Sequence, residues 1–170
     1  SASLTFEQNY GEVDGDSASV AELCALVSAL ADIPVRQDLA ITGSMNQFGE
    51  IQPIGGANEK VEGFFDTCVI KGLTGTQGVI IPATNVQNLM LDSRVVNAVR
   101  EGQFHIYAVH TVEDAIELLL GKPAGRADRK GHYPRGTVFA TIARRLADMR
   151  EHERQEHEAH SGAAKDSTIH

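Results

Sequence analysis

The sequence predicts a mixed α/β (α+β) domain, because apolar segments of two different periods alternate along most of the chain. Short apolar runs such as 78–82, Gly-Val-Ile-Ile-Pro, have the length and β-branched content of buried strands. Longer segments such as 17–31 and 57–71 repeat apolar residues every three or four positions, which is the period of an amphipathic helix. Strands that alternate with helices are typical of the α/β and α+β classes.

Length and composition limit the chain to an ordinary globular protein. With 170 residues, 42% of them hydrophobic, it can bury a core. No apolar run approaches the roughly 18 residues of a membrane-spanning helix, so we expect no contact with a membrane. The first residues also lack the pattern of a secretory signal. Cys24 and Cys68 lie in apolar segments, which predicts two buried thiols and a cytoplasmic location.

Charge is unevenly distributed along the chain. Residues 1–121 hold five Lys and Arg against sixteen Asp and Glu, whereas residues 122–170 hold ten against seven. Because an acidic surface repels phosphate groups, we expect no nucleic acid to bind to the first of these segments. Lysines are so rare there that Lys60 stands out.

Cap and turn residues set the ends of the expected elements. Gly72 is a typical residue just beyond a helix, and Thr111 with Asp114 resembles a capping box. Thr84 or Asn85 is expected to cap a short helix. Strands are expected at 4–8, 39–45, 51–54, 78–82 and 104–109, with a loop at 9–16 and a hairpin turn at 46–50. Helices are expected at 17–31, 57–71, 84–90, 93–101, 112–120 and 137–158.

The chain is expected to divide into four segments. Residues 1–121 form the α/β domain, and residues 122–135, which are basic and contain Pro and Gly, form a linker. Residues 136–160 are expected to form a C-terminal helix with an apolar stripe. Residues 161–170 are polar and are expected to form a disordered tail.

Ser17 and Lys60 are candidate catalytic groups. Ser17 follows a glycine-containing turn and opens an apolar helix, where free main-chain amides favour an oxyanion. Lys60 follows Gly55 and Gly56, and a neutral lysine amine can activate a serine as a base. Two alternatives stay open for each residue taken alone, because Ser17 also suits a helix cap and Lys60 also suits a solvated surface.

Several linked segments resemble the Lon proteases, over residues 3–120. The spacing between the motifs agrees with that family, with 43 residues from Ser17 to Lys60 and 18 from Thr42 to Lys60. The Asp-Ser-Ala-Ser form around Ser17 resembles the B-type and related Lon-like branches. The segments that carry the resemblance are 6–19 around Ser17, Ile-Thr-Gly-Ser at 41–44, Gly-Glu-Ile-Gln-Pro-Ile-Gly-Gly at 49–56, Glu-Lys at 59–60 and Val-Ile-Ile-Pro-Ala-Thr-Asn at 79–85.

The resemblance implies a fold, a reaction and a set of catalytic residues. The fold would be the ribosomal-protein-S5-domain-2-like fold of the Lon proteolytic domain, with an extra C-terminal helix. The reaction would be ATP-dependent hydrolysis of peptide bonds by a serine endopeptidase. Ser17 would attack the scissile carbonyl, and Lys60 would take its proton and return it to the leaving amine. Thr42 would hold the lysine amine, although it also suits an ordinary strand position.

Asp14 and Asp16 flank the candidate nucleophile and allow three interpretations. They orient Lys60 or the loop; or an Asp16–Lys60 ion pair keeps the lysine charged and the site inactive; or they belong to a polar turn. The chain also departs from the A-type pattern, because Asp16 replaces a proline and Ser19 replaces a glycine.

The resemblance also implies partners outside this chain. Because Ser17 lies so close to the first residue, we expect the N-terminal strands of the domain to be missing here. The chain has no Gly-x-x-x-x-Gly-Lys-Ser/Thr phosphate loop, so no cofactor is expected within it. ATP and Mg would bind to an ATPase domain elsewhere. The expected assembly is a homo-hexamer that degrades unfolded or damaged polypeptides in protein quality control.

A second function from a different class stays open. The same fold can serve as a non-catalytic or latent scaffold that supports the oligomerisation of an attached ATPase. Such a scaffold would not need Ser17 and Lys60 together. No metal site is expected, because the histidines near the C-terminus (His152, His157 and His160) lie in a polar, solvated segment.

Overall fold

The computed structural model describes residues 16–166 and divides the chain into two compact units after Ala124. The strand predicted at 4–8, most of the loop predicted at 9–16 and the candidate residue Asp14 lie outside the described residues. The other candidate site residues all lie in the first unit: Asp16, Ser17, Thr42 and Lys60.

A three-stranded parallel sheet forms the centre of the first unit. Its strands are β1 (Leu39–Ile41), β4 (Gly78–Pro82) and β5 (His105–Val109), in the order β1-β4-β5. All five residues of the central strand β4 are buried, as expected for a parallel strand covered on both faces. Two further strands, β2 (Ser44–Met45) and β3 (Ile51–Gln52), form an antiparallel hairpin.

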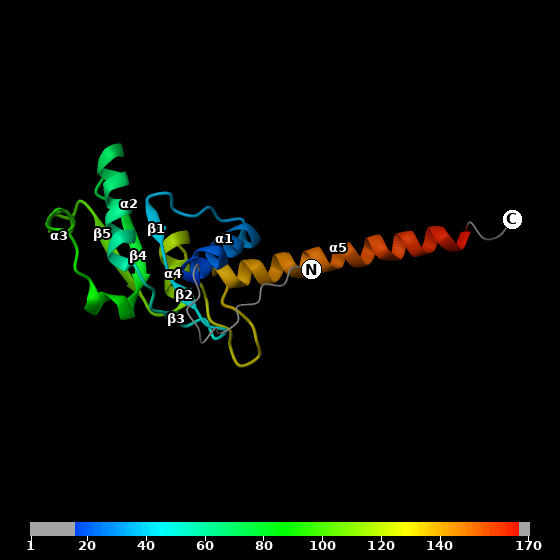
Figure 1. The fold of residues 1–170 in the computed structure, drawn as a ribbon. Coiled ribbons are helices and arrows are strands. Elements are labelled where there is room, and N and C mark those ends of the chain that lie inside the picture. The colour runs from blue at the N-terminus through cyan, green and yellow to red at the C-terminus, as the bar shows by residue number, and fades with distance from the viewer. Residues whose placement is uncertain (1–15, 167–170) are drawn as a thin grey trace. The chain divides into compact units, whose positions relative to one another are not determined.

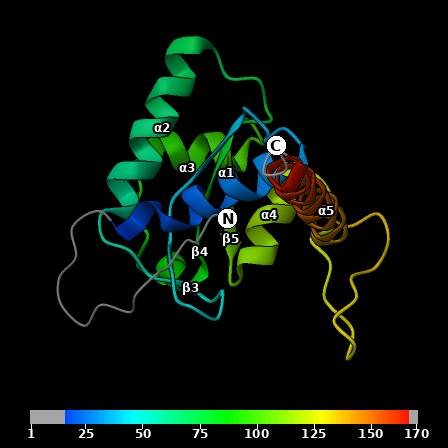
Figure 2. The same ribbon diagram turned by 90° about the vertical axis from the view of Figure 1, so that its right-hand side faces the viewer.

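Helices cover both faces of the parallel sheet. Helices α2 and α3 lie on one face and helices α1 and α4 on the other (Figure 1). Helix α1 lies beside α4 and contacts it (Figure 2). The bounds are α1 (Ser19–Ala31), α2 (Ala57–Lys71), α3 (Ser93–Arg100) and α4 (Val112–Leu120), with 3₁₀ turns η1 (Asp16–Ala18) and η2 (Ala83–Asn88).

One buried apolar cluster lies between β4 and the helices α2 and α3. Val79 and Ile81 alternate along β4 and point to the same face of the sheet, where they join apolar side chains from both helices. The Phe65 ring of α2 meets the Phe104 ring edge-on, with 5.2 Å between the ring centroids. This packing fixes α2, and with it Lys60, against the sheet.

Several expected elements are confirmed. The structure gives α2 and β4 the bounds that the sequence predicts. Thr111 and Asp114 form the capping box, with the Thr111 hydroxyl accepting from the Asp114 amide and the Asp114 carboxylate accepting from the Thr111 amide. Gly72 follows α2 with a φ of 92°, a conformation that favours glycine.

Three expectations about local structure are wrong. The strand predicted at 39–45 breaks into β1 and β2, because the Thr42 hydroxyl and the Gly43 amide bond to the Ser17 carbonyl in η1 instead of continuing the strand pairing. Neither Thr84 nor Asn85 caps a helix, since η2 follows Pro82 without a side-chain cap. The helix predicted at 17–31 begins as a 3₁₀ turn and becomes α-helical only at Ser19.

The second unit contains the helix α5 (Val138–Asp166). It is longer than the predicted helix, so residues 161–166, which were expected to be disordered, are helical. None of the helices in the described part of the chain is long and apolar enough to span a membrane.

Gly78 provides a test of the sheet packing. A Cβ atom at Gly78 would lie 2.6 Å from the main-chain carbonyl oxygen of His105, and main chain in a sheet cannot easily shift. We expect Gly78→Ala to reduce the free energy of unfolding in urea by about 1–3 kcal/mol. Gly63→Ala is the matched control, because nothing lies within 4 Å of its added Cβ in helix α2. It should raise stability by roughly 0.5–1 kcal/mol, and equal effects of the two substitutions would contradict this packing.

Candidate functional site

The structure brings Ser17 and Lys60 together. The Lys60 Nζ atom donates a hydrogen bond to Ser17 Oγ at 2.6 Å, although 43 residues separate the two along the chain. Ser17 is half-buried and Lys60 is exposed. A hydroxyl and an amine at this distance can exchange a proton directly.

Ser17 does not act as a helix cap. It lies in η1, and the residue that precedes α1, Ala18, makes no side-chain cap hydrogen bond. The Ser17 hydroxyl instead accepts from Lys60. A short 3₁₀ turn before the α-helix thus directs this side chain toward α2.

Residues 42–44, here called the clasp, hold η1 and the start of α1 in place. The Gly43 amide and the Thr42 hydroxyl both donate to the Ser17 carbonyl oxygen, at 2.9 and 3.1 Å. In return the Val20 amide donates to the Gly43 carbonyl at 3.2 Å. A Cβ atom at Gly43 would lie only 3.2 Å from Val20 Cγ2, so glycine allows this close approach.

The clasp also connects η1 to the central sheet. The Thr42 amide donates to the Ile80 carbonyl of β4 at 3.0 Å. The Thr42 side chain is buried, and its proton is directed at the Ser17 carbonyl rather than at the lysine amine. A bond from Lys60 to the remaining lone pair of Thr42 Oγ1 stays a prediction.

Asp16 is held by the third residue of the clasp. The Ser44 hydroxyl donates to Asp16 Oδ2, and Ser44 itself is 5% exposed. Within residues 16–166, no ion pair joins Asp16 to Lys60. Sequence reasoning missed Ser44, although its place in the Ile-Thr-Gly-Ser motif was a usable signal.

A second set of hydrogen bonds positions the start of α2. Asn85 is buried after β4, where its amide group accepts from the Ile54 amide at 3.0 Å and donates to the Ile54 carbonyl at 2.8 Å. Gly56, the residue before α2, has a φ of 66°, which favours glycine. The Lys60 amide donates to the Gly56 carbonyl at 3.1 Å. Asn85 was predicted only as a possible helix cap.

These residues meet at the carboxyl ends of the parallel strands. Thr42 directly follows β1, and Asn85 lies in the turn that follows β4. In sheets with parallel strands, ligand sites usually form at this edge, because the loops that follow the strands converge there. The position of the Ser17–Lys60 pair agrees with this rule.

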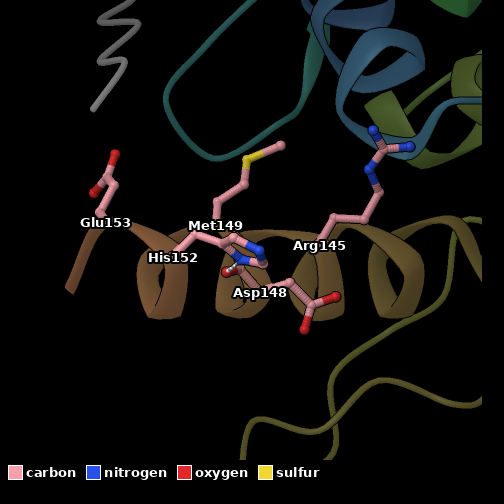
Figure 3. A pocket seen from close by; sticks show the side chains of 5 residues that line it. All are labelled: Arg145, Asp148, Met149, His152 and Glu153. Atoms are coloured by element: carbon pink, nitrogen blue, oxygen red, sulfur yellow. Dashed lines mark hydrogen bonds between the residues drawn. The ribbon is translucent and has the colours of Figure 1, made fainter. Parts of the chain in front are cut away.

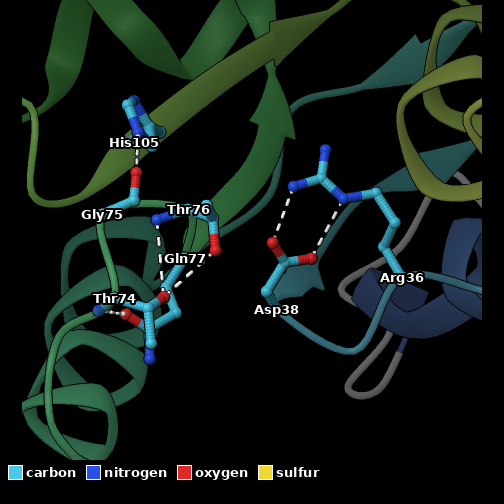
Figure 4. A network of polar contacts seen from close by, with 7 residues as sticks. All are labelled: Arg36, Asp38, Thr74, Gly75, Thr76, Gln77 and His105. Carbon is cyan, nitrogen blue, oxygen red and sulfur yellow. Dashed lines mark hydrogen bonds and ion pairs between the residues drawn. The ribbon is translucent and has the colours of Figure 1, made fainter.

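A hollow of about 380 Å³ lies at the opposite edge of the sheet, lined by residues 37–38, the last turns of α2, and Thr74, Thr76 and Gln77. The polar groups in and beside this hollow bond mainly to one another (Figure 4): Arg36 forms two hydrogen bonds with Asp38, and the His105 ring bonds to the Gly75 carbonyl at 2.8 Å. The Arg36 guanidinium holds the pKa of the Asp38 carboxyl below its usual value. This edge therefore offers a structural network rather than a reactive group.

Other candidate groups in the described residues are less suited to catalysis. Burial raises the pKa of the Cys24 thiol to about 11 and also raises that of Cys68, which keeps both protonated and unreactive. No cluster of three His, Cys, Asp or Glu residues suitable for a metal ion occurs between residues 16 and 166.

On α5, several side chains at helical spacing lie along one side of the helix (Figure 3). The His152 ring bonds to the Asp148 carbonyl of the preceding turn at 2.9 Å. This leaves one ring nitrogen for other contacts, but one helix face does not enclose a site. The side chains are Arg145, Asp148, Met149, His152 and Glu153.

Known proteins are similar to this chain over much of its length. Residues 11–122 match the family model described as Lon protease (S16) C-terminal proteolytic domain. A Lon protease homolog of Escherichia coli K12 is 58% identical over 153 residues, which are 90% of this chain and 25% of that protein. An archaeal Lon protease of Thermococcus kodakarensis is 38% identical over 117 residues, 69% of this chain and 16% of that protein. The chain thus spans about a quarter of the length of its more similar relatives.

Asn85 tests how the lysine segment is held. Asn85→Ala leaves the amide and the carbonyl of Ile54 without partners in a partly buried place. We expect the free energy of unfolding in urea to fall by about 2 kcal/mol. Asn88→Ala, at an exposed position of the same turn, should change it by less than about 0.5 kcal/mol. A similar loss in both variants would show that Asn85 does not fix this segment.

Proposed function

Because the chain belongs to the Lon protease C-terminal proteolytic domain family, we propose that it is the peptidase domain of an ATP-dependent serine endopeptidase. The single observation that carries the proposal is the 2.6 Å contact between Ser17 Oγ and Lys60 Nζ. Acyl transfer by a serine requires a base within hydrogen-bond reach. The lysine amine is the candidate for that base.

In this proposal the lysine acts in its neutral form. As Ser17 Oγ attacks the scissile carbonyl carbon, the amine takes the hydroxyl proton along the existing contact. The proton then passes to the leaving amine, which frees the C-terminal product and leaves an acyl-serine. Water attacks the acyl group with Lys60 again as base, which releases the second product and restores the hydroxyl.

The oxyanion of the tetrahedral intermediate needs donors near Ser17. The Val20 amide already donates to the Gly43 carbonyl, and the Gly43 amide already donates to the Ser17 carbonyl. The amides that begin η1 and α1 are better candidates, because the first amides of a helix lack intrahelical acceptors and carry partial positive charge. The clasp would hold them in position before substrate binds, which is what makes such donors effective.

Because Lys60 is exposed, a bound substrate can also favour the neutral form of its amine. Water around an exposed amine stabilises its charged form, and removal of that water favours the neutral form. An extended polypeptide bound across Ser17 would cover the amine and exclude water from it. An unfolded chain, which can present extended main chain, fits this requirement.

The remaining parts of the activity would come from outside this chain. No phosphate-loop motif occurs in the sequence, and the relatives are about four times longer than the matched segment. We propose that an ATPase domain, with its ATP and Mg, unfolds substrates and delivers them to the site. A ring of identical subunits, expected to be a hexamer, would restrict access to unfolded chains.

The proposal is tested by peptidase activity of the full-length protein on casein and on a short fluorogenic peptide. Ser17→Ala removes the nucleophile and Lys60→Ala removes the base, so each should reduce kcat by roughly 10² to 10⁴-fold or more. Ser28→Ala and Lys71→Ala are matched controls at the far ends of α1 and α2. Both controls should retain nearly full activity.

Equal activity in the wild type and in both site variants would contradict a Ser17–Lys60 mechanism. Absence of any peptidase activity in the full-length protein, with ATP and Mg supplied, would favour the alternative of a scaffold domain. A loss of activity in the controls as large as in the site variants would indicate a general loss of structure.

A further inference from the structure

We propose that Ser44 is a positioning residue that controls the state of the active site. By donating to Asp16, it holds this carboxylate away from Lys60 and leaves the lysine amine available to take the Ser17 proton. The inference rests on the proposed function and adds a regulatory contact to the same site. It assigns a role to a side chain that neither attacks the substrate nor moves a proton.

The position of Asp16 makes it the natural competitor of Ser17 for the lysine. Asp16 directly precedes Ser17, whose Oγ atom lies 2.6 Å from the amine. Neighbouring Cα atoms are only about 3.8 Å apart, so the Asp16 side chain begins one residue from the group that Lys60 contacts. In the structure this carboxylate accepts from Ser44 instead.

Ser44 is well suited to hold the carboxylate. It lies on β2, it is 5% exposed, and its hydroxyl has Asp16 as its hydrogen-bond partner in the described part of the chain. The adjoining residues Thr42 and Gly43 fix the main chain of the same turn. The donor is therefore rigid, whereas the Asp16 side chain that it holds is exposed and free to choose another partner.

The surroundings of Lys60 contain little other charge. Its neighbours on the same face of α2, at three and four positions on either side, are Gly56, Ala57, Gly63 and Phe64. Glu59 and Glu62 lie on the same helix; the Glu59 carboxylate reaches back toward Gly56, and Glu62 accepts from the Asp92 amide at 2.7 Å. The clasp, β3 and η2 contain no ionisable side chain. At the start of α1, only Glu22 is charged, and it is exposed one turn further along.

Asp16 is the described carboxylate that directly precedes the hydroxyl bound by Lys60. An ion pair between them stabilises the charged amine, which cannot accept a proton. A hydrogen bond from Ser44 competes with that ion pair for the same carboxylate oxygens. The site then has two states that differ by one side-chain rotation, and Ser44 favours the active one.

The experiment measures kcat/KM on the fluorogenic peptide across pH in the full-length protein. In Ser44→Ala the released carboxylate pairs with Lys60, so the pKa of the base rises. The acidic limb of the profile should move upward by about one pH unit, with roughly tenfold lower kcat/KM below that limb. Ser44→Cys keeps the side-chain size but donates weakly, and it should shift the limb in the same direction by less.

Two further variants separate this role from a loss of structure. In an Asp16→Asn background no carboxylate is present, so Ser44→Ala should leave the acidic limb where Asp16→Asn alone has it. Ser28→Ala, which also removes one serine hydrogen bond near α1, should leave the profile of the wild type unchanged. A shift that persists in the Asp16→Asn background, or no shift in Ser44→Ala, would overturn the inference.

Direct titration of the Lys60 amine by nitrogen NMR provides a readout that does not depend on activity. Its pKa should rise in Ser44→Ala and should not rise in the Asp16→Asn, Ser44→Ala double variant. A pKa that is the same in wild type and Ser44→Ala would overturn the role of Ser44 even in an active enzyme. If the wild type shows no peptidase activity that depends on Ser17, the proposed function is overturned instead. The two failures are therefore distinguishable.

Discussion

The hydrogen bonds between the clasp and the start of α1 are the constraint on which the candidate site depends. The Ser17 carbonyl accepts from both the Gly43 amide and the Thr42 hydroxyl, and Val20 returns a bond to Gly43. Since the Thr42 amide also bonds to Ile80 in the buried strand β4, the serine turn is fixed relative to the most rigid part of the fold. A serine held this firmly loses little conformational entropy when a substrate binds.

The lysine reaches the same place by an independent route. Helix α2 is fixed by its core contacts with β4 and by the Phe65–Phe104 ring contact, while Asn85 fixes the chain just before it. Both segments are thus connected to β4. The serine turn is connected through the main chain of the clasp, and the lysine segment through the turn that follows the strand. The two reactive atoms thus share one support, and a shift of either helix changes the 2.6 Å contact between them.

Polar groups have different roles at the two edges of the sheet. At the amino ends of the strands, Arg36, Asp38 and His105 bond to protein groups and leave little reactive capacity. At the carboxyl ends, Lys60 is exposed and has only the Ser17 hydroxyl as a hydrogen-bond partner among the described side chains. The Lys60 amine is thus open to groups that approach it from solvent.

The sequence by itself determined the elements whose signals are local. The bounds of α2 and β4, the capping box at Thr111 and the glycine after α2 follow from periodicity and cap chemistry. The linked motifs also identified Ser17 and Lys60 as a candidate pair. Only the tertiary structure decided the 3₁₀ turn at Ser17, the break at Thr42 and Gly43, the buried place of Asn85 and the Ser44–Asp16 contact. Each of these depends on partners more than 20 residues away in sequence, and such bonds override the local preferences that a single sequence reveals.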